Sequence, residues 1–346
     1  MAGMAEQERG SMLRNLPSFA LLAVLLFVVR QPGAQEIPRL RLPLECVLGT
    51  SCWIANHVDL DPGPGTLDYA CGHLTYNDHN GTDFAIRDLR AMADGVRVLA
   101  AAPGKVAAVR DSEPDISVRE RGLDAIKGKE CGNGVRVDHG GGWQTQYCHL
   151  QRRSIAVKPG DAVAAGDPIG RVGLSGKTEY PHLHFVVRRA GRILDPFRGD
   201  AGDKGCDSSG NPLWDAAARA GLQYAPGSIY NFGVAALPPT ATEVRAGGFR
   251  ERVVPADASV FAVWAEVFGV EAGDVLEIRL DGPDGSPLIK QLQPIEKRHA
   301  RIYRAVARKR GDRPWSPGEY QVRISLARAK GSTHSASSVS FTAQVQ

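Results

Sequence analysis

The chain has 346 residues, 43% of them hydrophobic and 23% charged, which fits a globular protein with room for about two domains. The formal net charge is +4, but the 42 Lys and Arg and the 38 Asp and Glu residues are mixed along the whole chain. Proteins that bind nucleic acid gather their basic residues into a patch or stripe, so this distribution argues against a nucleic-acid partner.

The N-terminal segment has the pattern of an export signal. Arg14 precedes the apolar run LPSFALLAVLLFVV (16–29), and small residues suited to cleavage follow in RQPGAQE (30–36). The run is shorter than the roughly 20 residues that span a bilayer comfortably, although an uncleaved anchor is the alternative. We therefore expect residues 1–35 to be a signal peptide, or else an anchor that supplies the only membrane contact, and the rest of the chain to be exported.

Six cysteines in an exported chain make an even set that can close three disulfides. A zinc cluster is the alternative, but no C-x-x-C pair exists. Cys131 and Cys148 flank two alternating runs joined by GGG (140–142), so we expect them to face each other across a hairpin. For the other four we expect Cys46–Cys52 and Cys71–Cys206, on local spacing only.

Short β-like runs separated by Gly or Pro fill residues 80–195, and helical periodicity is scarce. Short helical or irregular links are expected at 86–95 and 214–222. The β-like runs are TDFAI (82–86), VRVLAAAPGKVAAVR (96–110), GVRVDHGGGWQTQYCHL (134–150), GDPIGRVG (166–173) and HLHFVVRR (182–189).

A second domain is predicted after FGVAALPPTATEV (232–244), where Pro238 and Pro239 interrupt any regular element. Beyond this point the cysteines stop. Alternating runs at 259–268, 274–285, 300–309, 318–329 and 337–345 are spaced like a small immunoglobulin-like β-sandwich. We therefore place one domain at 36–236 and a β-sandwich module at 237–346, with a mainly β fold throughout.

Three histidine motifs on separate β-like segments indicate a functional site. His182 and His184 stand one residue apart in YPHLHF (180–185), so in a strand both rings leave the same face. His79 and Asp83 stand four apart around Gly81, which would let the chain turn so that both reach one cation. Alone, that pair is more often a surface hydrogen bond. His149, in QYCHL (146–150), would alone be read as a core residue.

Together, HNGTD (79–83), QYCHL and AVKPGDAVAAGDPIGRVGLSGKTEYPHLHFVV (156–187) resemble the lysostaphin-like, or LytM-type, zinc metalloendopeptidases that cut peptidoglycan peptides. The resemblance covers about residues 70–200. It implies an antiparallel β-sheet metallopeptidase domain with one Zn²⁺ held by His79, Asp83 and His184, and it makes His182 and His149 the two catalytic histidines that do not bind metal.

The implied chemistry is physically consistent, because three protein ligands leave the fourth zinc position open and zinc lowers the pKa of bound water to about 7. We expect His182 to act as general base and His149 to donate a hydrogen bond to the oxyanion, although the two roles could be exchanged. His73 lacks an Asp four residues on, His139 lies at the DHGGG turn, and three others have no partner pattern: His57, His299 and His334. We assign none of these five histidines a function.

The resemblance implies a periplasmic enzyme that hydrolyses peptide cross-links of peptidoglycan, in a Gram-negative envelope between D-alanine and diaminopimelate. Two alternatives remain: a catalytically silent scaffold that binds the wall or regulates an amidase, and a zinc endopeptidase that acts on a secreted protein. Retention of His149 and His182 argues against the silent scaffold, since a structural zinc would need neither.

Overall fold

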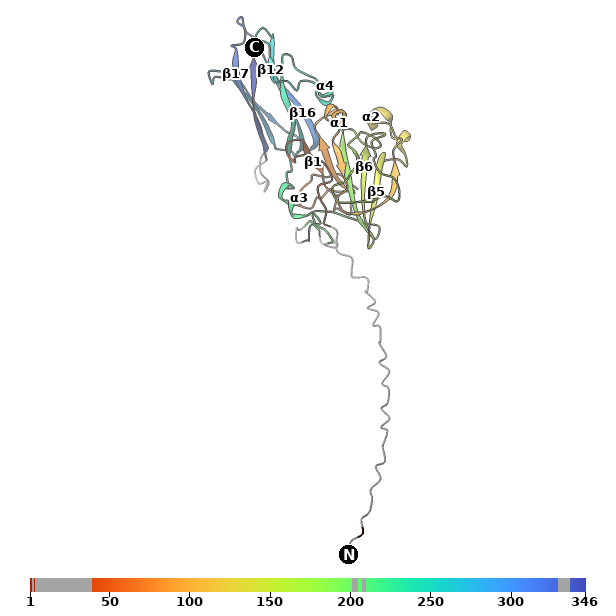
Figure 1. Cartoon of the computed structure of the whole chain (residues 1–346). Helices are drawn as coiled ribbons and strands as arrows, with labels where there is room; N and C mark the ends of the chain where they lie inside the picture. The colour runs from red at the N-terminus through yellow and green to blue at the C-terminus, as the bar shows by residue number, and fades with distance from the viewer. Residues whose placement is uncertain (2, 4–38, 201–204, 207–209, 329–336) are drawn as a thin grey trace. The chain divides into compact units, whose positions relative to one another are not determined.

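A computed structural model describes residues 1, 3, 39–200, 205–206, 210–328 and 337–346 (Figure 1). The predicted export signal lies almost entirely outside these residues. Residues 36–346 form one compact unit. Within the described part of the chain, every helix is too short or too polar to cross a membrane.

An antiparallel sheet of eight strands forms the first half of this unit, and its order is β1-β2-β9-β6-β5-β4-β7 with β10 added beside β9. Two further strands, β3 (Arg97–Leu99) and β8 (Pro168–Arg171), form a small sheet of their own. The eight strands are β1 (Cys52–Asn56), β2 (Thr82–Ile86), β9 (His182–Arg189), β6 (Trp143–Leu150), β5 (Asn133–Gly140), β4 (Gly104–Arg110), β7 (Ala162–Val163) and β10 (Arg192–Leu194).

Alternation in β9 separates the two faces of the large sheet. Leu183, Phe185 and Val187 are buried in the hydrophobic core, whereas His182 and His184 leave the strand on the other face. Phe84, which lies between Asp83 and Ala85 in β2, packs into the same core. One face of the sheet is therefore anchored in the core and the other carries polar groups.

Helices are short, as the sequence predicts. In α1 the side chain of Asp88 accepts a hydrogen bond from the Ala91 N–H, and Gly95 ends the helix in the left-handed conformation. The helices are α1 (Leu89–Asp94), α2 (Val118–Arg121), the 3₁₀ helix η1 (Asp124–Ile126), α3 (Ala216–Gly221) and α4 (Ala241–Arg245).

Two sheets that share a hydrophobic core make up the C-terminal half, which is a β-sandwich. In β17 every second residue from Tyr320 to Leu326 faces this core, as period-2 alternation requires. One sheet has the order β11 (Ser228–Ala235), β13 (Val260–Val270) and β16 (His299–Lys309). The other has the order β12 (Val253–Val254), β18 (Ser337–Val345), β17 (Gly318–Ala327), β14 (Val275–Asp281) and β15 (Pro287–Pro294).

The mainly β, antiparallel fold class is confirmed, with β12 and β18 as a parallel pair. Strand β11 pairs with β13 although it precedes the predicted boundary at 237, because its residues complete the three-stranded sheet. The domain boundary and the immunoglobulin-like assignment remain predictions. Strand β15 was not foreseen, since it begins and ends with Pro and lies at a sheet edge, where Pro is tolerated.

All three expected disulfides are present: Cys46–Cys52, Cys71–Cys206 and Cys131–Cys148. The third joins Cys131, two residues before β5, to Cys148 in β6, the neighbouring strand in the sheet. It therefore fixes the hairpin that carries His149.

Replacing Cys131 and Cys148 by Ala should lower the free energy of unfolding by about 3 kcal/mol, because the bond restrains a segment of 17 residues in the unfolded chain. The control is the Cys46→Ala/Cys52→Ala protein, in which the lost bond spans 6 residues and the expected loss is only about 2 kcal/mol. Urea unfolding followed by Trp fluorescence measures both. A control that loses as much as the hairpin variant would contradict the chain-entropy explanation.

Candidate metal centre

Strand register places four polar or sulfur-bearing residues in one row across the large sheet. Asn56 in β1 is opposite Asp83 in β2, Asp83 is opposite His184 in β9, and His184 is opposite Cys148 in β6. Residues that are directly opposite in neighbouring strands share a face of the sheet. Side chains that are far apart in the sequence therefore meet on the face that is turned away from the core.

His79 reaches this row from the loop before β2. Gly81 lies between His79 and Asp83, and a Cβ atom at that position would lie 2.7 Å from both the His184 ring and the Phe185 carbonyl oxygen. The chain bends at Gly81, and the close approach of the loop to His184 also leaves no space for a side chain there.

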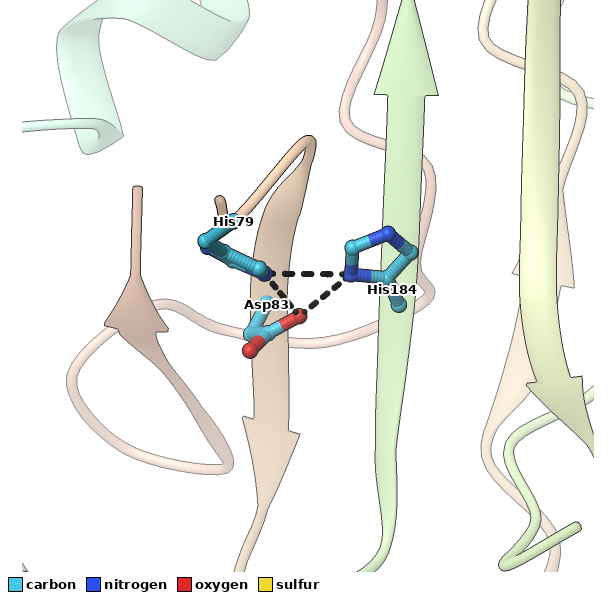
Figure 2. Close-up of side chains that lie close together, drawn as sticks. All are labelled: His79, Asp83 and His184. Carbon is cyan, nitrogen blue, oxygen red and sulfur yellow. Dashed lines mark hydrogen bonds and ion pairs between the residues drawn. The ribbon is translucent and has the colours of Figure 1, made fainter. Parts of the chain in front are cut away.

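Three atoms from these segments converge. The Oδ1 atom of Asp83 lies 3.2 Å from His79 Nε2 and 2.8 Å from His184 Nδ1, and the two nitrogens are 3.2 Å apart (Figure 2). His79 and Asp83 are buried and His184 is half-buried. The sequence predicted this triad, and the structure brings it together.

The outward atoms of the triad each have a hydrogen-bond partner. His79 Nδ1–H donates to the carbonyl oxygen of His57 over 2.6 Å, and His184 Nε2–H donates to Asn80 Oδ1 over 3.0 Å. The Asn56 amide donates to Asp83 Oδ2 over 2.9 Å. These bonds fix the tautomers, so that the inward Nε2 of His79 and the inward Nδ1 of His184 carry lone pairs.

Electrostatics keep the carboxylate charged. Burial alone would raise the pKa of Asp83, but the neighbouring His79 and His182 outweigh it and hold this pKa well below its usual range. Burial lowers the pKa of His184, and its hydrogen bond to Asp83 compensates only in part. Burial would also lower the pKa of His79, but the charge and hydrogen bond of Asp83 outweigh it and raise this pKa. Because an ionised carboxylate and neutral imidazole are the forms that bind a divalent metal, metal binding competes with a proton on His79.

The donor set fits a tetrahedral metal ion. Imidazole nitrogen and carboxylate oxygen bind zinc at about 2.0–2.1 Å, which places the ligand atoms of a tetrahedral site about 3.3 Å apart. The observed separations of 2.8–3.2 Å are close to this value. Three lone-pair atoms from three parts of the fold could therefore hold a metal ion, and as only three protein ligands they would leave a fourth position open.

His182 and His149 lie beside the triad, with ring centroids 4.7 Å apart. His182 Nδ1–H donates to the Tyr180 carbonyl over 2.9 Å, and its Nε2 lies 3.4 Å from Asp83 Oδ1. His149 Nδ1–H donates to the Ser175 carbonyl over 2.8 Å. Both rings therefore donate through Nδ1 to a backbone carbonyl.

A β-bulge aims His149 at the site. Cys148 faces the same side of the sheet as His184, so regular alternation would point His149 to the other side. Instead, the β5–β6 register shifts here and His149 has φ +63°. This left-handed conformation is unfavourable for a residue other than Gly and is often found at functional sites. The sequence motif identified the residue but gave no sign of the bulge.

An open groove of about 420 Å³ runs past the triad. His79, His149 and His184 line it together with Tyr76, Glu130, Gln146, Lys177 and Arg188. Residues 55–72 do not line this groove. The groove instead borders the loop 76–80 on one side and the disulfide of the β5–β6 hairpin on the other.

Sequence reasoning missed the outward partners Asn56 and Asn80 and the backbone carbonyls of His57 and Ser175. No motif marks them, because two act through the backbone and the other two depend on strand and loop positions. His139, read as a turn residue, bonds to the Pro103 carbonyl and Thr145, and His334 lies outside the described residues.

Comparison with known proteins gives a match to the family model described as Peptidase family M23 over residues 77–196. Peptidoglycan DD-endopeptidase ShyB of Vibrio cholerae serotype O1 is 33% identical over 122 residues, which cover 35% of this chain and 23% of that protein. Cell division protein DipM of Caulobacter vibrioides is 34% identical over 101 residues, which cover 29% and 14%.

The DD-carboxypeptidase/endopeptidase Mpg of Neisseria meningitidis serogroup B is 38% identical over 77 residues, covering 22% of this chain and 17% of that protein. The chain thus spans less than a quarter of the length of these relatives. The family match begins two residues before His79, contains the whole triad and both additional histidines, and ends just after β10. Residues 77–196 are therefore a domain of peptidase family M23.

Proposed function

We propose that this chain is a zinc-dependent endopeptidase that hydrolyses peptide cross-links of peptidoglycan in the periplasm. The observation that carries the proposal is the convergence of His79 Nε2, Asp83 Oδ1 and His184 Nδ1 beside two further histidines. In this proposal the three converging atoms hold one zinc ion. When bound, zinc acts as a Lewis acid that lowers the pKa of water to about 7 and polarises a carbonyl group.

The two histidines outside the triad would handle protons. With Nδ1–H bound to the Tyr180 carbonyl, His182 presents the lone pair of Nε2 and can accept a proton from the attacking water. Having accepted it, the ring becomes a donor that can pass the proton to the departing amine. Asp83 Oδ1 lies 3.4 Å from this Nε2.

His149 is proposed to stabilise the oxyanion, a role that requires a proton on Nε2 because its Nδ1–H already bonds to Ser175. Burial and the neighbouring His182 and His184 lower the pKa of His149 well below its usual range. A lowered pKa favours the neutral ring, whose Nε2 carries a lone pair. The proposal therefore includes the exchanged assignment, in which His149 is the general base and His182 donates to the oxyanion.

The substrate assignment rests on the relatives and on the site. ShyB bears the name of a peptidoglycan DD-endopeptidase, and Mpg of a DD-carboxypeptidase/endopeptidase. An open groove beside the triad suits an extended, branched peptide. Three disulfides fit an oxidising compartment such as the periplasm. We propose the bond between D-alanine and diaminopimelate as the one cleaved.

Purified sacculi should release soluble muropeptides when incubated with the wild-type protein but not with His182→Ala or His184→Ala, because each variant lacks a group that the hydrolysis needs. Loss of at least 100-fold in rate is expected. His73→Ala, an exposed histidine outside the groove, serves as the matched control and should keep full activity. Equal release by all four proteins would contradict the enzymatic function, and mass spectrometry of the products identifies the bond.

Metal content should separate the ligands from the proton-transfer residues. His184→Ala and Asp83→Ala are expected to lose bound zinc, whereas His182→Ala and His149→Ala should retain about one zinc ion per chain, since neither ring belongs to the triad. Atomic emission spectroscopy of the purified proteins measures this directly. Loss of zinc from His182→Ala would show that the ligand assignment is wrong.

Asn56→Ala should weaken zinc binding about 10–100-fold, because the amide that orients Asp83 is lost while every ligand remains. Competition with a chromogenic chelator gives the dissociation constant. Asn77→Ala is the control, since Asn77 lines the same groove but bonds to Asp78 rather than to the triad. If the two variants bind zinc with equal affinity, the outward hydrogen bond to Asp83 has no role in holding the metal.

A further inference from the structure

The face of the sheet that carries the triad also carries two arginines that have no acidic partner in the described part of the chain. Residues 184, 186 and 188 of β9 alternate onto one face, so Arg188 shares the face of His184. Arg136 in β5 is opposite Gln146, and Gln146 is opposite Val186, which places Arg136 on that face too. Arg188 lines the groove of the triad, and Arg136 lines a hollow of about 220 Å³ that shares Gln146 with it.

Arg188 is held in place by uncharged groups. Its Nη1–H donates to Gln146 Oε1 over 2.8 Å. The Gln146 amide in turn lies 3.1 Å from Cys148 Sγ and 3.3 Å from Cys131 Sγ, so the disulfide orients it. The guanidinium is half-buried and pre-positioned, and its other N–H groups remain available as donors.

Neither of the two guanidinium groups forms an ion pair within the described part of the chain, although Glu130 lines the same groove as Arg188. Among the described residues, no carboxylate oxygen lies within 4.0 Å of Arg188 or Arg136. Asp138 follows on the same face of β5, and its Oδ1 accepts a hydrogen bond from Gly140 N–H. The neighbouring Arg189, which points to the other face, is paired with Asp200 at 2.7 Å. Two adjacent arginines of β9 thus differ in that only one is neutralised.

The positive charges of two neighbouring arginines repel each other, and a bound anion would relieve this repulsion. Burial and the charge of Arg136 both lower the pKa of Arg188, which is the direction expected for a guanidinium without a counter-ion. A planar guanidinium matches a carboxylate through two parallel hydrogen bonds. A carboxylate in the groove would therefore supply both the missing charge and the missing acceptors.

We propose that Arg188, supported by Arg136, binds a carboxylate of the peptide substrate and so selects acidic stem peptides. The inference rests on the proposed function and adds to it the substrate feature that the groove recognises. Along β9, His184 and Arg188 are about 13 Å apart at roughly 3.3 Å per residue. An extended peptide covers that distance in about four residues, so the recognised carboxylate lies within about four residues of the cleaved bond.

Among the carboxylates of a cross-linked stem peptide, those of diaminopimelate and of the terminal D-alanine lie within this distance of the cleaved bond. A synthetic cross-linked peptide is therefore prepared in three forms, with both carboxylates free, with the diaminopimelate carboxylate as an amide, and with the terminal D-alanine as an amide. Binding is measured by calorimetry to the His182→Ala protein, which should hold metal and peptide without turnover, and cleavage is measured with His182 present.

For the recognised carboxylate we expect amidation to weaken binding at least 10-fold and to raise KM with little change in kcat. The free and amidated peptides should differ less than 2-fold in their affinity for His182→Ala/Arg188→Gln. They should also differ less than 2-fold in KM when Arg188→Gln cleaves them. Arg189→Gln removes the same charge from the same strand on the other face and should keep the wild-type preference. Thermal unfolding of each variant verifies that the fold is retained.

The outcomes separate this inference from the proposed function. Equal binding and cleavage of all three peptides by proteins that contain Arg188 overturns the carboxylate site and leaves the endopeptidase function intact. A binding preference that Arg188→Gln removes, combined with no cleavage of any peptide, supports the site and overturns the endopeptidase function. A preference that survives in Arg188→Gln overturns the assignment to this residue.

Discussion

The register between β1, β2, β9 and β6 is the constraint on which the site depends. It aligns Asn56, Asp83, His184 and Cys148 in one row, although these residues span most of the first half of the chain. A shift of one residue in the β2–β9 pairing would turn Asp83 or His184 toward the core and bring Phe84 or Phe185 to the other face. Phe84 and Phe185, both fully buried, oppose such a shift. The hydrophobic core on one face thus sets the geometry of the polar groups on the other.

Buried polar groups make this arrangement costly unless each has a partner. Carbonyl oxygens of His57, Tyr180 and Ser175 accept from three of the histidines, and Asn80 accepts from the fourth. Every ring is held through its outward nitrogen, so its inward nitrogen needs no rearrangement to bind metal or accept a proton. Fixing these groups in the folded chain reduces the reorganisation that binding and catalysis would otherwise require.

The H-x-x-x-D and H-x-H spacings marked candidate residues because they are local properties, but it was the resemblance to the LytM-type peptidases that assigned the triad. Alternation placed the strands of the large sheet in which it is strong. Sequence reasoning did not foresee that Gly81 lies against the ring of His184, which belongs to a strand about 100 residues away. It could not foresee the bulge at His149 or the position of β11, because both follow from pairing with distant strands. The outward partners of the triad were missed for the same reason, since a backbone carbonyl carries no signature in the sequence.

Tyr180 links the catalytic sheet to the β-sandwich. Its ring stacks on His182 with centroids 4.7 Å apart, and its hydroxyl lies 3.4 Å from the Asn56 amide that orients Asp83. From the sandwich, Phe268 of β13 contacts the same ring at 5.6 Å, and the Arg301 guanidinium of β16 lies 4.9 Å from its centroid. Contacts of this kind need a fixed interface rather than a flexible tether. The sandwich therefore belongs to the structure that supports His182, which explains why residues 36–346 form one compact unit although the family match ends at residue 196.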